Sequence, residues 1–330
     1  MESLVGLKVL VTGDTGFIGS WMCQVLVRRG VKVVGVGLKP NTNPSLFKVL
    51  KLEQKIKHYT LDITDKKKLE EVIGKENPEI VIHLAAQSLV RRSYDEPMKT
   101  FKTNILGTVN LLEIVKEAKI KAIVVATTDK VYAGNKKRSF KEIDALGGGK
   151  DAYSLSKAGA DWLAQQYEVG IARAANVIGG GDWSKDRLLP DLMRTVYENG
   201  KELVIRYPEA VRVWQHVLEM VQGYLKLVGK TGAYNFGPER DGQMKVIEFI
   251  RKVETLGDRR VKVKVRPEKA KAEEKYVGIS IDKAREKLGY SPKLSFKQAL
   301  KMSLDWYKTY YTKGDVAKLT NQQIDQYFKL

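Results

Sequence analysis

The sequence has little cysteine and little histidine. Cys23 is the only cysteine among 330 residues, which excludes an internal disulfide and any metal site built on several cysteines. The three histidines, His58, His83 and His216, are too scattered to predict a metal site. No apolar run reaches the roughly 18 residues that a membrane-spanning helix needs. The first strand-like run begins at about residue 7 and leaves no room for a signal peptide, so a cytoplasmic, membrane-free globular protein is expected.

Acidic residues are few relative to basic ones. The chain has 58 Lys and Arg against 39 Asp and Glu, a formal net charge of +19. Nucleic-acid binding would explain this excess. However, the lysines are dispersed, and the densest basic clusters carry acids within or beside them, so we favour a solvated lysine-rich surface. An anionic substrate would also suit a basic cleft. High lysine and glutamate with one cysteine suggests a heat-loving source.

The first half of the chain alternates between two kinds of segment. Short apolar runs rich in β-branched residues predict buried strands, and helical spacing between them predicts helices that include 97–118 and 151–168. This alternation predicts an α/β fold with a Rossmann-type doubly wound parallel sheet. After about residue 180 the pattern is less regular, which indicates a smaller, discontinuous C-terminal lobe. The six predicted strands are 7–13, 31–38, 56–64, 78–86, 120–128 and 170–180.

A glycine-rich loop follows the first predicted strand. Gly13, Gly16 and Gly19 form GxxGxxG between that strand and the next helix. The absence of side chains at such a junction lets a pyrophosphate approach the backbone amides at the helix N-terminus. Residues 1–175 are therefore predicted to be a dinucleotide-binding Rossmann domain. Residues 176–330 are predicted to form mostly a substrate-binding lobe, with a helix at about 213–228 returning to the first domain.

The choice of dinucleotide stays open at this stage. NAD sites usually carry an acid at the end of the second strand, yet the stretch GVGLKPNTNPSLF has none. Lys39 could meet the extra phosphate of NADP, or it could be a surface lysine. We expect NAD and leave NADP open. Asp62, at the end of the third strand, is a candidate for an adenine contact or simply an acid at a helix N-terminus.

Polar side chains follow the fifth predicted strand. The stretch TTDK, residues 127–130, lies at the carboxyl end of that strand, where ligands bind in doubly wound folds. Asp129 and Lys130 could alternatively pair only with each other. Tyr153 and Lys157 follow on one face of a predicted helix. An ammonium group lowers the pKa of a nearby phenol, so this tyrosine could take a proton from a hydroxyl group.

The YxxxK spacing is not specific by itself. It also occurs at Tyr132 and Lys136 and at Tyr197 and Lys201. Only Tyr153 opens the helix that follows the fifth strand, so we interpret the other two as chance.

Motifs along nearly the whole chain resemble the extended short-chain dehydrogenase/reductase superfamily. They are the glycine loop, HLAAQ (83–87), TN (103–104), TTD (127–129), YSLSK (153–157) and ARAANVIGG (172–180). Longer stretches, among them HLAAQSLVRRSYDEP, NVIGGGDW and WQHVLE, are similar to the CDP-glucose 4,6-dehydratases of the NAD-dependent epimerase/dehydratase family. The resemblance implies a hydro-lyase of deoxysugar and O-antigen or polysaccharide biosynthesis. It would oxidise C4 of CDP-D-glucose, remove water across C5–C6 and return hydride to C6, giving CDP-4-dehydro-6-deoxy-D-glucose.

The resemblance also implies residue roles. Tyr153, with Lys157, would take the C4 hydroxyl proton; Thr128 would hold the C4 oxygen; Asp129 would be the acid at C6 and Lys130 the base at C5. The implied cofactor contacts are Gly13, Thr15, Gly16, Phe17, Ile18, Gly19, Asp62, Ile63, Leu84, Ala85, Ala86, Gln87, Thr103, Thr127, Tyr153 and Lys157. The implied substrate contacts are Ser88, Arg91, Arg92, Asn104, Asn176, Arg187, Leu188, Arg212 and His216.

The sequence also leads to expectations about the assembly of the protein and about other possible functions. In relatives the helices near 97–118 and 153–168 form a dimer contact, so a homodimer is expected. Other readings are a UDP-N-acetylglucosamine or other nucleotide-hexose 4,6-dehydratase, a sugar-nucleotide epimerase, and a basic cofactor-bound regulator or RNA-binding Rossmann protein. Where relatives often show a His-Glu pair, this chain has Glu273 and Glu274, which bears on recognition of cytosine.

Overall fold

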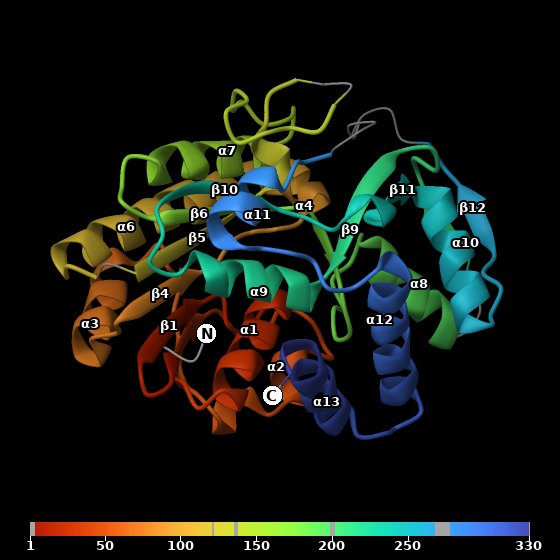
Figure 1. Cartoon of the computed structure of the whole chain (residues 1–330), viewed down its shortest axis with the longest axis horizontal. Coiled ribbons are helices and arrows are strands. Elements are labelled where there is room, and N and C mark those ends of the chain that lie inside the picture. The colour runs from red at the N-terminus through yellow and green to blue at the C-terminus, as the bar shows by residue number, and fades with distance from the viewer. Residues whose placement is uncertain (1–3, 121, 135–137, 199–201, 268–277, 330) are drawn as a thin grey trace.

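The computed structural model describes residues 4–120, 122–134, 138–198, 202–267 and 278–329 (Figure 1). Its main element is a seven-stranded sheet of order β10-β6-β5-β4-β1-β2-β3, in which all neighbours are parallel. This confirms the predicted doubly wound sheet. The strands are β1 (Lys8–Thr12), β2 (Lys32–Gly37), β3 (Lys57–Thr60), β4 (Ile80–His83), β5 (Ala122–Thr128), β6 (Gly170–Ala174) and β10 (Gly232–Phe236).

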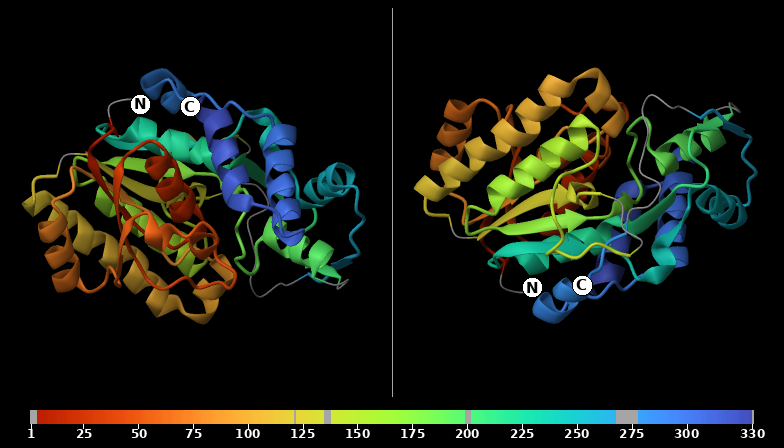
Figure 2. Two further views of the ribbon diagram at one scale, coloured as in Figure 1. Left: turned by 90° about the horizontal axis from the view of Figure 1, so that it is seen from below. Right: turned by 90° about the horizontal axis from the view of Figure 1, so that it is seen from above.

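Helices cover both faces of this sheet (Figures 1 and 2). One face carries α3 (Lys66–Glu76), α6 (Gly107–Glu117) and α7 (Ala152–Ala164); the other carries α1 (Phe17–Arg28) and α9 (Val217–Leu227). Strand side chains alternate between two apolar cores, so Leu10 packs on the α3–α6 side whereas Val9 and Val11 pack on the α1 side. Burial of both faces explains why these strands are continuous apolar runs in the sequence.

The predicted long helix at 97–118 is a continuous helical stretch that changes its winding. It begins as α5 (Pro97–Phe101), continues as a π-helical segment, η3 (Lys102–Leu106), and ends as α6. Single π turns inside helices are frequent at functional sites. This one carries Thr103 and Asn104, and the short helix α4 (Val90–Asp95) precedes the stretch.

The second lobe lies beside the carboxyl ends of the main strands, at the right of Figure 1. It holds a three-stranded sheet of order β11-β9-β7 and a two-stranded parallel pair, β12-β8. Its strands are β7 (Asn176–Ile178), β8 (Leu203–Ile205), β9 (Val211–His216), β11 (Gln243–Lys245) and β12 (Val263–Val265). Its helices are α8 (Leu188–Tyr197), α10 (Val246–Gly257) and α12 (Phe296–Tyr311), whereas α11 (Asp282–Leu288) packs against β10 of the main sheet.

Two predicted elements are wrong in detail, and one strand of the main sheet was missed. The predicted strand 170–180 is two strands, because the chain leaves the main sheet after β6 and β7 pairs with β9 instead. The predicted helix 213–228 begins only at Val217, because the preceding residues pair with β7 and β11 as strand β9. The helical part, α9, packs against α1 and β6. The missed element is β10, the seventh strand of the main sheet.

The C-terminal helix α13 (Val316–Phe328) also packs on α1, where Asp325 forms an ion pair with Arg28 at 2.7 Å. The remaining short helical segments are α2 (Leu46–Val49), η2 (Leu52–Gln54), η4 (Asp129–Val131) and η5 (Arg240–Gly242). Within the part of the chain that the structure describes, none of the helices combines the length and apolar character needed to cross a bilayer.

Candidate active site

A cavity of about 620 Å³ opens at the carboxyl ends of the main strands, between the sheet and the second lobe. It lies where β1 is flanked by β2 on one side and β4 on the other, the point at which doubly wound sheets bind ligands. Its lining includes every residue predicted to contact the cofactor and all five predicted catalytic residues. The fold therefore brings the predicted cofactor contacts and the predicted catalytic residues, which are far apart in the sequence, into one cavity.

The glycine loop forms a cradle that side chains would fill. Gly13 has φ +74°, and a Cβ on it would lie 2.7 Å from the backbone nitrogen of Ala85. A Cβ on Gly19 would lie 2.0 Å from the carbonyl oxygen of Gly13. Gly16 is the N-cap of α1 and offers no side-chain cap, so the first amides of the helix are left for a ligand. These features fit the pyrophosphate of a dinucleotide.

Beyond the glycine loop, the residues of the cavity do not by themselves identify which dinucleotide is bound. Asp62 lines the cavity, but its Oδ1 accepts hydrogen bonds from the backbone and the hydroxyl of Thr64, both at 2.9 Å. Lys39 also lines the cavity. The second strand ends at Gly37, which brings no carboxylate of its own.

The TTDK stretch ends β5 and turns at once into η4. Thr128 Oγ1 donates to Asp129 Oδ1 at 3.0 Å, and the backbone nitrogen of Lys130 donates to Thr128 Oγ1 at 3.4 Å. Asp129 is only 3% exposed. Burial raises the pKa of its carboxyl group, although the nearby charges of Lys130 and Arg212 oppose the rise. A raised pKa favours the protonated form, which is the form that a general acid needs.

Tyr153 and Lys157 lie in the first turns of α7, which Asp151 caps through its contact with the Ser154 nitrogen at 2.8 Å. Burial raises the pKa of the Tyr153 phenol, and the adjacent Thr128 hydroxyl counteracts part of the rise. Burial lowers the pKa of Lys157 to about 8, with Asp161 acting in the opposite direction. Burial therefore favours the uncharged form of both groups. For Tyr153 the net effect is a raised pKa, opposite to the lowering that the sequence pattern predicted.

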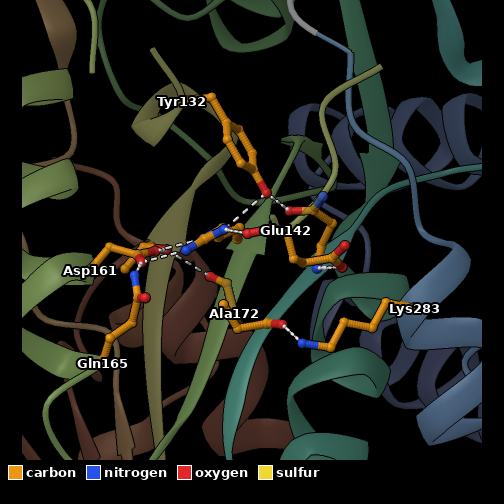
Figure 3. A network of polar contacts seen from close by, with 10 residues as sticks. Tyr132, Glu142, Asp161, Gln165, Ala172 and Lys283 are labelled. Atoms are coloured by element: carbon orange, nitrogen blue, oxygen red, sulfur yellow. Dashed lines mark hydrogen bonds and ion pairs between the residues drawn. The ribbon is translucent and has the colours of Figure 1, made fainter. Parts of the chain in front are cut away.

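Behind the TTDK stretch lies a buried polar network that sequence reasoning missed (Figure 3). Asp161 accepts a hydrogen bond from Thr127 Oγ1 at 2.8 Å and binds Arg173 through Nε at 2.9 Å and Nη2 at 2.7 Å. Arg173 also donates to the Tyr132 hydroxyl at 3.1 Å, which donates to Asn235 at 2.6 Å. The signal was available, because Asp161 follows Tyr153 and Lys157 at the same four-residue spacing.

The other two YxxxK tyrosines are occupied elsewhere. Tyr132 belongs to the buried network, and Tyr197 stacks on Tyr311 with ring centroids 4.5 Å apart. Lys136, Lys201, Glu273 and Glu274 lie outside the described residues.

Arginines dominate the part of the cavity that faces the second lobe. Arg187 Nη2 donates to Ser88 Oγ at 3.3 Å, and Arg91 Nε lies 3.2 Å from Asp186 Oδ1. Arg206, which sequence reasoning missed, contacts the same oxygen at 3.0 Å. Planar guanidinium groups suit the oxygens of a diphosphate. The predicted substrate residues on the lining are Ser88, Arg91, Arg92, Asn176, Arg187, Leu188 and Arg212.

Two predicted substrate residues do not reach the lining. Asn104, in the π turn, accepts from the Gln87 nitrogen at 2.8 Å and donates to Ser156 at 2.9 Å, so its side chain holds the loop after β4. His216 is fully buried as the N-cap of α9, with its ring edge-on to Trp21. Burial lowers the pKa of His216 to about 3, which keeps the ring neutral. Their side chains are placed to support neighbouring elements rather than to touch a ligand.

Comparisons with known proteins agree with this geometry. The family model described as GDP-mannose 4,6 dehydratase matches residues 10–303. The chain is 38% identical to a CDP-glucose 4,6-dehydratase of Salmonella typhimurium, over 98% of this chain and 96% of that protein. A UDP-glucose 4-epimerase of Thermotoga maritima, solved with UDP-glucose, is 26% identical with a TM-score of 0.81, over 92% of this chain and 99% of that one. A dTDP-glucose 4,6-dehydratase of Bacillus anthracis, solved with NAD, shares the fold at 24% identity and a TM-score of 0.81, over 94% and 100% of the two chains.

Proposed function

Since this chain belongs to the GDP-mannose 4,6 dehydratase family, we propose that it is an NAD-dependent hydro-lyase that converts CDP-D-glucose into CDP-4-dehydro-6-deoxy-D-glucose. The observation that carries the proposal is the gathering of Thr128, Asp129, Lys130 and Tyr153 on one wall of a single cavity. The choice of CDP-glucose rests on the 38% identity to a CDP-glucose dehydratase over almost the entire chain.

The bound dinucleotide would be held by the glycine cradle and would accept hydride from C4 and return it to C6. Tyr153 takes the proton of the C4 hydroxyl, and Lys157 beside it stabilises the phenolate. Thr128 donates a hydrogen bond to the C4 oxygen. Once C4 is a ketone, Lys130 removes the acidified C5 proton and Asp129 gives a proton to the departing C6 hydroxyl, so that one water leaves. Lys130 gives the proton back to C5 as hydride returns to C6.

The arginines of the cavity would bind the diphosphate of the substrate. Arg187 and Arg212 both line the cavity, as does Asn176, whose Nδ2 donates to the carbonyl oxygen of Val213 at 3.1 Å. Two guanidinium groups facing one cavity can hold a diphosphate by paired hydrogen bonds. A nucleotide-linked sugar placed in this way would extend its hexose toward β5, where the TTDK side chains lie.

An epimerase is the second candidate, because the 26% identical relative of known structure is an epimerase. An epimerase needs the oxidation at C4 but neither the acid at C6 nor the base at C5. The adjacent Asp129 and Lys130, with the pKa of the former raised, favour the dehydratase.

A homodimer in the cytoplasm is the assembly that we propose. Large apolar side chains are exposed on α5, η3 and α7, where a globular surface is normally polar. They are Met98 (77% exposed), Leu106 (43%), Leu155 (42%) and Trp162 (67%). Because these elements contact one another, a second copy could cover them by a helix-on-helix contact.

Incubation of the purified protein with CDP-, dTDP-, UDP- and GDP-hexoses tests the function. A 4-keto sugar develops a near-ultraviolet absorbance in alkali, and we expect it to form most efficiently from CDP-glucose. Conversion of a UDP-hexose to its C4 epimer, with no keto product from CDP-glucose, would replace the dehydratase by the epimerase. Formation of keto product mainly from another nucleotide would change the substrate but not the reaction.

A further inference from the structure

The second strand lacks the acid that most NAD-binding Rossmann domains use. Such an acid, at the end of that strand, accepts a hydrogen bond from the adenosine ribose and repels the 2′-phosphate of NADP. Here the strand ends Gly35-Val36-Gly37, and the cavity lining continues with Leu38 and Lys39. A lysine alone at this place would favour NADP, so some other group must account for a preference for NAD.

A carboxylate from a different element lies against this strand end. A Cβ on Gly37 would be only 2.6 Å from Asp14 Oδ1, and a Cβ on Gly35 only 2.1 Å from Asp14 Oδ2. Asp14 is the second residue of the glycine loop. Its carboxylate therefore occupies the space that side chains on Gly35 and Gly37 would need, and the two glycines are what make room for it.

The surroundings of this carboxylate leave one oxygen without a partner. Oδ2 lies 2.7 Å from His58 Nδ1, whereas Oδ1 is buried and has no hydrogen-bond partner among the described residues. Asp14 itself is fully buried. A negative charge in such a dry place is weakly screened and acts strongly on charges nearby. Asp14 is not among the residues that line the cavity, but its neighbours Gly37 and Thr15 are, so its charge lies directly behind the cavity wall.

We propose that Asp14 is the specificity residue that selects NAD over NADP, supplying from the glycine loop the negative charge that the second strand lacks. Its Oδ1 lies at the wall that Gly37 forms, where it disfavours a 2′-phosphate. Lys39 acts in the opposite direction, and the carboxylate outweighs it because it is buried and fixed. The inference rests on the proposed dinucleotide-binding function and is independent of which nucleotide sugar is the substrate.

The test measures binding of the oxidised dinucleotides to the full-length protein, by calorimetry or by quenching of intrinsic fluorescence, without substrate. We expect the wild type to bind NAD more tightly than NADP. Asp14→Asn keeps the shape and removes the charge, and it should move the ratio of the two Kd values toward NADP by about tenfold or more. An unchanged ratio in a folded Asp14→Asn variant would overturn the proposal.

A matched control and an exchange of positions sharpen the result. Asp191→Asn removes a carboxylate from the lining of the same cavity, on α8, and should leave the ratio unchanged; an equal shift there would show that total charge, not Asp14, sets the preference. Gly37→Asp alone should lower Tm, because its side chain collides with Asp14. The exchange Asp14→Gly with Gly37→Asp should fold and restore the preference for NAD. An exchange variant that folds but prefers NADP would contradict the proposal, even if Asp14→Asn proved too unstable to study.

This experiment separates the specificity from the proposed function. Loss of both dinucleotides from every variant and from the wild type would count against the cofactor itself and hence against the proposal. Keto-sugar formation by the wild type, measured separately, tests the dehydratase without reference to Asp14.

Discussion

Lys157 Nζ donates a hydrogen bond to the backbone oxygen of Ala126 at 2.6 Å. The bond ties α7 to β5 two residues before Thr128, and it fixes how the face of the helix that bears Tyr153 meets the end of the strand. A helix and a strand that are distant in sequence are thus locked together at the point where the chemistry is proposed. The ammonium group is thus a structural donor in this structure, and in the proposed reaction it also supplies the charge that stabilises the phenolate.

The stability of the protein should depend on pH through this lysine. Burial lowers the pKa of Lys157 to about 8, from 10.5 in an exposed chain. Between these values the unfolded state holds more protons than the folded state, so the free energy of unfolding from this group rises with pH. Below pH about 8 both states are protonated and the cost of burying the charge is fully present. Relative to Lys157→Met, the wild type should gain on the order of 3 kcal/mol at most from pH 7 to pH 11. Denaturant unfolding at several pH values measures this, and parallel curves for the two proteins would contradict it.

Asp129→Asn should separate oxidation from dehydration. The first hydride transfer needs Tyr153 but no acid at C6, so addition of CDP-glucose should still reduce the bound cofactor, visible as near-ultraviolet absorbance. Loss of water should then slow by about 10²- to 10⁴-fold, the usual contribution of a general acid. Normal turnover by Asp129→Asn would remove the proposed role of the carboxyl group as acid.

Tyr153→Phe should block the reaction at its first step, the oxidation at C4. Without the phenol no group takes the C4 proton, so neither reduced cofactor nor keto product should appear, while the Kd of a CDP-sugar changes little. A rapid absorbance trace on mixing with substrate checks the first point. Cofactor reduction at the wild-type rate would assign the base role elsewhere.

The sequence predicted the architecture of the first domain because both faces of its sheet are buried. Val9, Val11 and Ile82 belong to continuous apolar runs, and such runs predict buried strands whichever helices cover them. It could not predict that the chain leaves the sheet after Ala174, because β6 and β7 are equally apolar and only tertiary pairing separates them. Likewise β10, with the sequence GAYNF, is too short and mixed in character to stand out.

Site residues that belong to a local sequence motif were predicted from the sequence. Site residues whose position depends on long-range contacts were not. The glycine loop and TTDK line the cavity as expected. His216 carries no local sign that it would cap a buried helix. Arg206 lies in a stretch without a motif and shares Asp186, on another loop, with Arg91. Contacts of this kind depend on how the second lobe folds back.

Arg212→Ala should mainly raise KM for the nucleotide sugar. The guanidinium lines the cavity and donates to the carbonyl oxygen of Val211 at 3.0 Å, which holds it at the start of β9. Loss of one charged hydrogen-bonding group to a diphosphate costs about 1.5–3 kcal/mol, or roughly 10- to 100-fold in affinity. Steady-state kinetics gives kcat and KM separately, and Arg251→Ala, on an outer helix of the second lobe, is the matched control. An unchanged affinity would remove Arg212 from the diphosphate site.

Asp161→Leu should destabilise the protein more than the paired change Asp161→Leu with Arg173→Met. Asp161 and Arg173 are almost fully buried and joined by two hydrogen bonds (Figure 3). Removal of one partner leaves an uncompensated buried charge, which costs about 3–5 kcal/mol, whereas replacement of both by apolar residues is often close to neutral. Urea unfolding of the single and double variants measures the difference. In both variants Thr127 loses its acceptor on Asp161 and keeps only the longer contact to the Ala172 carbonyl oxygen at 3.4 Å. If the network also positions the TTDK stretch, kcat should therefore stay low in the double variant after stability has recovered. Full recovery of kcat together with stability would limit the pair to a structural role.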